Sequence, residues 1–369
     1  MRRNLRQAVE GSFFCIQEEN MGKIVGLTYD LKADWIARAD DPIDASAEWD
    51  KPATVDRIAQ ALESAGHKVK KIGGVFNLLS EIDRLNVDIV FNICEGSKGR
   101  NRESQVPLIL EMKDIPFVGA DALTLGATLD KVFAKKMFMA DGIPTPRFFT
   151  AVSTKNLKEL NTIGYPLIVK TRHEGTSKGL TNASRVEDFA GLKRQVEIIL
   201  DQYDQPALAE EFISGTECTV PVLGNANPEA MPVVQVSIDG DVKLDDRFFT
   251  FEMVSYNGLN YVCPSKLPEA LNKKIQEIAL RAYQCVECRD FGRVDFRIDK
   301  KGNPYVLEIN PLPSLAQADV FNIFPKVIAS SYDDILNKIL NFALERYGML
   351  EKKKEPARKS RLAGELRAV

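Results

Sequence analysis

The sequence predicts an α/β (α+β) protein with an open parallel sheet in its N-terminal part and a β-hairpin near its C-terminal end. Strand-like and helix-like segments alternate between residues 21 and 120, which is typical of a parallel sheet with helical crossovers. An apolar strand at Pro166–Lys170 leads into the polar loop HEGTSKG at 173–179. Residues 292–311 alternate between apolar and polar side chains around a glycine turn, which indicates a hairpin.

The elements of the N-terminal part follow from short apolar runs, which predict strands, and from helical spacing of apolar residues. In chain order we expect a strand at Ile24–Thr28, a helix at Val55–Ser64, a strand at His67–Ile72, a helical stretch around Glu81 and a strand at 87–93. The loop at 29–52 is long and acidic, and such loops in compact chains are usually functional or mobile.

The same patterns continue towards the C-terminus, with a break at GIPTPRF, 142–148. They predict helices at Leu123–Ala127, Lys131–Ala140, Val186–Gln202, Leu267–Cys285 and Tyr332–Glu345, and two strands flanking Ser214-Gly215. We expect five segments: a disordered extension at 1–20, an N-terminal domain at 21–120, a central unit at 121–205, a C-terminal unit at 206–348 and a charged tail at 349–369.

Composition excludes several classes of function. Lysine and arginine total 49 against 52 acidic residues, so no global positive field favours nucleic acid. No apolar run approaches the ~20 residues of a membrane-spanning helix. Six cysteines in 369 residues are too few for a disulfide scaffold. The single CxxC of Cys285 and Cys288, with only two histidines, lacks the ligands of a zinc site. We expect a cytoplasmic protein that binds neither nucleic acid nor membranes.

The hairpin is the most informative segment. If its turn is the two-residue Lys301-Gly302, Asp295 lies opposite Glu308 and Arg293 lies opposite Asn310. Opposed residues point to the same face of a sheet, so two carboxylates, an amide and a guanidinium are expected to converge. Strict alternation on the second strand places Tyr305, Leu307 and Ile309 on one face and Val306, Glu308 and Asn310 on the other.

Two interpretations of this polar face remain open from the hairpin alone. Like charges about 5 Å apart repel unless a proton or a cation lies between them, and oxygen ligands without histidine or cysteine suit magnesium. The alternative is a solvated face on which Arg293 and Arg297 neutralise the acids.

Loop 173–179 has features of a phosphate-binding loop. Its small residues allow backbone N–H groups to approach phosphate oxygens, and Thr176 and Ser177 add hydroxyl donors, although the loop matches no standard phosphate-binding pattern. Lys170 ends an apolar strand and needs an anionic partner, whereas Lys131, which opens a helix, could equally be surface charge. A plain surface loop is the alternative, unless a nucleotide contacts all these groups together.

These segments, in this order, resemble the ATP-grasp carboxylate–amine ligases, and among them the D-alanine–D-alanine ligase family. The resemblance runs from about Val87 to Tyr347 and is weaker before that. Its most specific stretches are IPFVGADALTLGATLDKVFAKKMFMADGIPTPRF, GYPLIVKTRHEGTSKG, EEFISGTECTVPVLG and the hairpin ending in LEINPLPSL. The implied fold is an ATP-grasp fold, preceded by an N-terminal open parallel-sheet domain.

The resemblance implies roles for particular residues. Phosphate contacts are implied for Lys131 and Lys170, with loop 173–179, including Glu174, Gly175, Thr176 and Ser177, covering the triphosphate. Glu210, Phe212 and Ile213 fall in the adenine-binding segment, and Glu217 fits the ribose-binding carboxylate. Asp295, Glu308 and Asn310 match the magnesium ligands, and Arg293, Thr176 and Ser314 are assigned to the chemical steps.

The implied chemistry has two steps. ATP transfers its γ-phosphoryl group to a substrate carboxylate, and an amine then displaces phosphate from the acyl phosphate. The implied cofactors are ATP and Mg²⁺, with Mn²⁺ as a possible substitute, and the substrates are small amino acids or carboxylates. The resemblance also suggests a homodimer formed through the N-terminal domain.

The chain departs from the family where the amino acids bind. The family's glycine-rich turn with an amine-binding glutamate is missing at Tyr29–Asp34, and Glu48 or Asp50 is a candidate substitute. Glu95-Gly96 replaces a His-Gly turn, and Arg100 and Arg102 hint at an acidic substrate. A family lysine near Val254 is lost, Tyr256 is a candidate for the nearby tyrosine, and Asp319 replaces a serine, with helix capping as the alternative role.

Two hypotheses follow from this pattern. The first is an ATP-dependent ligase of the D-alanine–D-alanine ligase type whose amino-acid substrates need not be two D-alanines. The second is an ATP-grasp protein that binds nucleotide without turnover, which the lost lysine favours and the intact hairpin residues oppose. A dehydrogenase-type first domain is disfavoured because no GxGxxG follows Ile24–Thr28.

Overall fold

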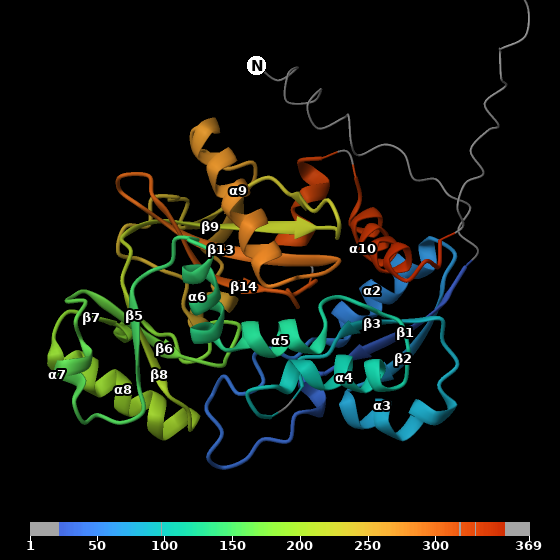
Figure 1. The fold of residues 1–369 in the computed structure, drawn as a ribbon, viewed down its shortest axis with the longest axis horizontal. Coiled ribbons are helices and arrows are strands. Elements are labelled where there is room, and N and C mark those ends of the chain that lie inside the picture. The colour runs from blue at the N-terminus through green and yellow to red at the C-terminus, as the bar shows by residue number, and fades with distance from the viewer. Residues whose placement is uncertain (1–21, 97, 317–318, 329, 351–369) are drawn as a thin grey trace, which may run out of the picture.

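The computed structural model describes residues 22–96, 98–316, 319–328 and 330–350. The predicted extension at 1–20 and nearly all of the predicted tail at 349–369 lie outside these residues. Within them the chain forms three β-sheets, one parallel and two antiparallel, with helices packed against each (Figure 1). The mixed α/β class predicted from the sequence is confirmed.

The N-terminal sheet is parallel, as predicted, with the strand order β2-β1-β3-β4. Helix α2 packs on one face together with the C-terminal helix, and α3 and α4 pack on the other (Figure 1). The elements are β1 (Ile24–Tyr29), α2 (Pro52–Ser64), β2 (Lys68–Gly73), α3 (Val75–Glu81), β3 (Ile89–Ile93), α4 (Gln105–Met112) and β4 (Phe117–Val118).

The second sheet is antiparallel in the order β5-β8-β6-β7. The helix predicted from Val186 begins only at Phe189, because Val186 pairs with Leu167 in the sheet and Asp188 caps the helix by accepting the Gly191 N–H at 2.7 Å. The elements of this region are α5 (Ala122–Leu129), α6 (Lys131–Ala140), β5 (Phe148–Ala151), α7 (Leu157–Leu160), β6 (Leu167–Thr171), β7 (Arg185–Val186), α8 (Phe189–Tyr203) and β8 (Ala207–Glu211).

The third sheet has the order β12-β11-β9-β13-β14, with β10 paired to β9. The two strands predicted around Ser214-Gly215 are present, but β8 belongs to the second sheet and β9 to the third, so this turn connects the two sheets. The elements are β9 (Gly215–Leu223), β10 (Glu229–Ala230), β11 (Val234–Ile238), β12 (Leu259–Val262), α9 (Glu269–Cys285), β13 (Phe291–Asp299), β14 (Pro304–Asn310) and α10 (Tyr332–Arg346).

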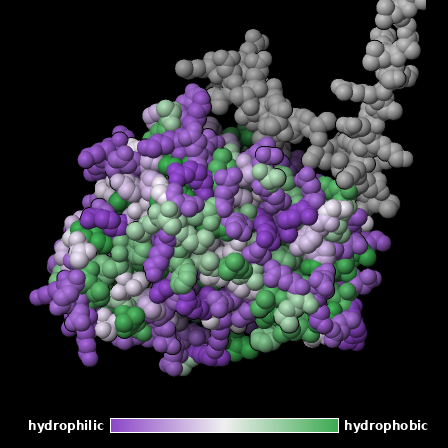
Figure 2. Space-filling model, in the orientation of Figure 1, coloured by the Kyte–Doolittle hydropathy of each residue, from purple (hydrophilic) through white to green (hydrophobic). Residues whose placement is uncertain are grey.

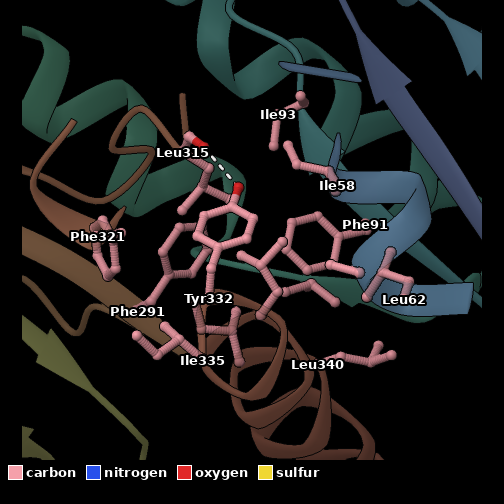
Figure 3. Close-up of a cluster of buried hydrophobic side chains, with 14 of the residues drawn as sticks. Ile58, Leu62, Phe91, Ile93, Phe291, Leu315, Phe321, Tyr332, Ile335 and Leu340 are labelled. Carbon is pink, nitrogen blue, oxygen red and sulfur yellow. Dashed lines mark hydrogen bonds between the residues drawn. The ribbon is translucent and has the colours of Figure 1, made fainter. Parts of the chain in front are cut away.

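One apolar core joins the two ends of the described chain. Side chains of β1, β3 and α2 pack against Phe291 and against the inner face of α10 (Figure 3). The Tyr332 hydroxyl, which is buried in this cluster, donates to the Leu315 carbonyl at 2.6 Å. The C-terminal helix is therefore part of the N-terminal sheet's core rather than an appendage.

The surface is mixed. On the face shown in Figure 2, hydrophilic side chains surround scattered apolar patches. None of the helices in the described part of the chain has the length and apolar character needed to cross a membrane.

Candidate active site at the junction of the two antiparallel sheets

The hairpin predicted from the sequence is formed by β13 and β14. Asp295 lies opposite Glu308, and Arg293 lies opposite Asn310. The alternate side chains of β13, Val294, Phe296 and Ile298, are buried in the core beneath α9. The sequence therefore brings two carboxylates, a guanidinium and an amide to one face, because the other face of the strand is fixed in the core.

The turn and the alternation of the second strand were predicted wrongly. Asp299 pairs with Asn303 through a backbone bond, so the loop has three residues, 300–302, rather than two. A β-bulge between the Phe296–Val306 and Asp295–Glu308 pairs then inserts one residue in β14. Val306 therefore shares the core face with Ile309 instead of facing the site with Glu308. The bulge compensates for the longer turn, which is why the predicted pairing of the two acids holds.

Asp295 is surrounded by donors. The Arg293 guanidinium binds both of its oxygens at 3.0 Å, and the Asn310 amide donates at 2.9 Å. The Thr219 hydroxyl, on neighbouring β9, donates to it at 2.6 Å. Burial lowers the pKa of Arg293, but Asp295 and Asp319 outweigh burial and raise it, so this guanidinium stays charged.

Glu308 faces a lysine instead of a second arginine. The Lys131 ammonium, at the start of α6, lies 3.2 Å from its carboxylate and also donates to the Glu174 carbonyl of loop 173–179. Burial raises the pKa of Glu308, but Lys131 and Lys170 outweigh burial and hold it at about 2. The carboxylates of Asp295 and Glu308 therefore lie opposite each other on the hairpin, and each is bound by a cation of this chain that a divalent ion could replace.

A buried ion cluster lies beside this pair. Glu210 on β8 is fully buried and binds Lys135 of α6 and Lys170 of β6, each at 3.0 Å. Burial lowers the pKa of Lys135 to about 8, whereas at Lys170 the attraction of Glu210 outweighs burial and raises the pKa. Two ammonium groups thus share one carboxylate. One carboxylate neutralises only one positive charge, so the other remains available to an anion.

The segment between the two sheets is held by an arginine that was not predicted as a site residue. Arg297 of β13 donates to the Ile213 carbonyl at 2.9 Å and lies 3.1 Å from Glu217. Its guanidinium lies 5.2 Å from the centre of the Phe212 ring. Burial raises the pKa of Glu217, and Arg297 opposes this increase. The predicted residues Phe212, Ile213 and Glu217 therefore meet around one buried cation.

Loop 173–179 is bound to the acidic loop at 29–52. The Gly175 N–H donates to Glu48 at 2.6 Å, and the Gly179 N–H donates to Asp44 at 2.7 Å. Thr176 and Ser177 both have left-handed backbone angles, φ 47° and 55°, and the Thr176 side chain is exposed. Two backbone donors of the predicted phosphate loop are thus occupied by carboxylates of this chain.

The residues proposed for the amino-acid subsites have partners within this chain. Glu48 is already bound by Arg102 at 2.6 Å, so neither group is left to meet a substrate directly. Arg100 is half-exposed and lies 2.8 Å from Asp130. Tyr256 donates to Asp239. Asp319 caps a short 3₁₀ turn, as the alternative role predicts, and Ser314 accepts a bond from the Ala316 N–H in its own loop.

Three contacting residues were missed by sequence reasoning. Lys135 lies one helical turn after Lys131, so the i, i+4 spacing on α6 was a usable signal. Thr219 left no such signal, because it reaches the site through pairing of β9 with β13, which lie far apart in sequence. Alternation on β13 places Arg297 on the polar face, but its partner Glu217 comes from β9 and could not be predicted.

Comparisons with known proteins identify the family. Residues 137–341 match the family model described as D-ala D-ala ligase C-terminus. An uncharacterized protein of Sinorhizobium fredii, y4sG, is 32% identical over 309 residues, covering 81% of this chain and 90% of that protein. The D-alanine–D-alanine ligase of Carboxydothermus hydrogenoformans is 32% identical over 305 residues, covering 79% and 93%.

Solved structures show the same fold. The D-alanine–D-alanine ligase of Bacillus anthracis in complex with ATP superposes with a TM-score of 0.68 at 21% identity, covering 89% of this chain and 99% of that one. The VanG D-Ala:D-Ser ligase of Enterococcus faecalis gives 0.68 at 20% identity, covering 88% and 100%. The fold is therefore the ATP-grasp fold, and this chain belongs to the D-alanine–D-alanine ligase family.

Proposed function

We propose that the protein is an ATP-dependent ligase that joins a carboxylate to an amine through an acyl phosphate. The observation that carries the proposal is the meeting of two opposed carboxylates, Asp295 and Glu308, with the ammonium groups of Lys131 and Lys170. Membership of the D-alanine–D-alanine ligase family supports it. The altered amino-acid subsites support a substrate pair other than two D-alanines.

The nucleotide is proposed to lie between the second and third sheets. Lys131 and Lys170 contact its phosphates, with loop 173–179 covering them. The adenine lies against the segment that joins the two sheets, and Glu217 binds the ribose. The residues proposed for this nucleotide site are Lys131, Lys170, Glu174, Gly175, Thr176, Ser177, Glu210, Phe212, Ile213 and Glu217.

The donor set fits a hard divalent cation. Asp295, Glu308 and Asn310 offer carboxylate and amide oxygens with no competing sulfur or imidazole, which suits Mg²⁺. When bound, Mg²⁺ supplies charge neutralisation for the phosphate oxygens. Thr219 and Arg293 hold the Asp295 carboxylate in place for this role.

The chain's own residues account for both steps. In the first, a substrate carboxylate oxygen bonds to the γ-phosphorus while the bond to the β-phosphate oxygen breaks and ADP leaves, and Lys131 and Lys170 neutralise the crowded oxygens. In the second, the amine nitrogen bonds to the acyl carbon, loses a proton and displaces phosphate. Arg293, with a backbone N–H near Ser314, holds the oxyanion, and Thr176 closes the site with loop 173–179.

The organisation around the site remains a proposal too. We propose that the domains follow the predicted boundaries 21–120, 121–205 and 206–348, and that the protein is a cytoplasmic homodimer. Its substrates are proposed to be small amino acids or related carboxylates.

The test is phosphate release from ATP and Mg²⁺ across a panel of D- and L-amino acids and dipeptides. We expect at least one pair to stimulate release, and Glu308→Gln to lower the rate by about 10²-fold or more, since a charged group acting on the transition state is removed. Glu269→Gln on the exposed start of α9 is the matched control and should keep wild-type rates. If binding of ATP is detected but no substrate stimulates release, the nucleotide-binding alternative replaces the proposal.

A further inference from the structure

One face of the second sheet carries buried charge beneath α6. Phe148 on β5 and Ile168 on β6 both lie opposite Glu210 on β8, and Lys170 follows Ile168 by two residues. Phe148, Glu210 and Lys170 therefore share this face, while the other face of the same strands packs against α8 in an apolar core. From α6, Lys135 brings a second ammonium group to Glu210, 5.8 Å from the centre of the Phe148 ring.

Lys135 is the deeper of the two ammonium groups. Its side chain is 1% exposed, against 8% for that of Lys170, and each ammonium nitrogen lies 3.0 Å from a different oxygen of Glu210. Lys135 also donates to the Thr145 hydroxyl at 2.7 Å, and that hydroxyl donates in turn to the Val306 carbonyl at 2.8 Å. Lys135 is therefore enclosed by groups of this chain, whereas Lys170 lies nearer the surface.

The charges of this cluster do not cancel. Burial raises the pKa of Glu210, but Lys135 and Lys170 outweigh burial and lower it, so Glu210 is ionised at pH 7. Burial lowers the pKa of Lys135 to about 8, which keeps this lysine protonated at pH 7. Glu308 attracts both lysines as well, but it is paired with Lys131. Two ammonium groups and one carboxylate thus leave one positive charge.

We propose that Lys135 is a positioning residue for the nucleotide: by neutralising Glu210, it leaves the charge of Lys170 free for the phosphates. The inference rests on the proposed function, in which Lys170 contacts the phosphates, and it adds a residue that acts on the nucleotide without touching it. Without Lys135, Glu210 and Lys170 form a neutral pair. Because charges in a buried site are weakly screened, the lost charge weakens binding of the phosphates but not of adenosine.

The experiment measures the dissociation constants of ADP and adenosine for the full chain at pH 7 with Mg²⁺, by equilibrium competition with radiolabelled ADP. The readout is the ratio of the two constants, because a change in the shape of the adenosine site affects both ligands and cancels. Lys135→Met removes the charge from a side chain of similar length. It should reduce the preference for ADP over adenosine by about 10-fold or more, as for loss of a charged hydrogen bond.

Three further variants separate charge from structure. Lys136→Met, an exposed change one residue further along α6, is the matched control and should keep the ratio within about twofold of wild type. The double variant Lys135→Met/Glu210→Gln removes one positive and one negative charge, so Lys170 keeps its free charge and the ratio should return to within about threefold of wild type. Lys135→Gln, which retains a donor for Thr145, should behave as Lys135→Met and replaces it if that variant does not fold.

A lowered ratio in the single variants at Lys135, restored in the double variant, supports the proposal. An unchanged ratio in the single variants, or an equal loss of ADP and adenosine binding, overturns the role of Lys135 and leaves the ligase function standing. A ratio that stays low in the double variant overturns it too, because charge balance then does not explain the loss. A wild-type protein that binds no ADP overturns both this inference and the proposed function.

Discussion

Some side chains of the candidate active site could be predicted from the sequence, and others could not. Asp295 and Glu308 were predicted because one face of β13 is apolar, which fixes where the polar face must point. Lys135 and Arg297 were not, because a buried lysine or arginine looks like surface charge until its partners, Glu210 and Glu217, come from other strands. At the residue scale, sequence therefore shows which groups share a strand face but not which charges become buried together.

The buried Glu103 gives a pH-dependent stability prediction. Because the pKa of Glu103 is raised to about 7 in the fold, the folded state binds more protons than the unfolded state between about pH 4.5 and 7. Stability attributable to this group is therefore lost as pH rises through that window. We expect Glu103→Gln to have the melting temperature of wild type near pH 4.5. Near pH 8 it should melt about 2–4 °C higher, which corresponds to a gain of about 1 kcal/mol in the free energy of unfolding. Thermal denaturation at the two pH values measures both. A constant difference across this pH range would contradict the raised pKa.

At the scale of elements, the site depends on two features that alternation alone does not reveal. The sequence predicted a two-residue turn and no bulge. The turn has three residues, and the bulge in β14 offsets the extra one, so the predicted pairing of Asp295 with Glu308 is still present. The acidic loop at 29–52 was expected to be functional or mobile, but its partner, loop 173–179, lies more than a hundred residues away. Such contacts between distant loops have no local sequence signal.

The docking of these loops predicts the effect of one carboxylate. Asp44 accepts from the Gly179 N–H at 2.7 Å and from the Tyr203 hydroxyl at 2.9 Å. Asp44→Ala leaves both donors without this acceptor, so the free energy of local opening should fall by about 1–2 kcal/mol. Hydrogen exchange in residues 173–179 should therefore become about 5–30-fold faster. Asp40→Ala, an exposed change in the same loop, should leave exchange unchanged. Equal exchange in both variants would show that Asp44 does not anchor the loop.

For the whole molecule, local sequence patterns predicted individual sheets better than the packing between them. The parallel sheet and the hairpin follow from local periodicity. The shared core of β1, β3, α2 and α10 does not, because apolar faces on these elements show that each is buried but not against what (Figure 3).

This shared core predicts that both ends of the chain unfold together. Ile339 on α10 is fully buried in it, so Ile339→Ala should lower the free energy of unfolding by about 2–5 kcal/mol. Protection from hydrogen exchange should fall in β1 and β3 as well as in α10. Glu345→Ala, exposed on the same helix, is the control. Loss of protection confined to α10 would contradict a single core.

The most direct test of the account is a crystal structure of the protein with ADP and Mn²⁺, located by its anomalous scattering. We expect a manganese peak about 2.0–2.6 Å from carboxylate oxygens of Asp295 and Glu308, with the diphosphate next to Lys131 and Lys170. A nucleotide bound elsewhere, or a manganese peak away from both carboxylates, would contradict the proposed active site.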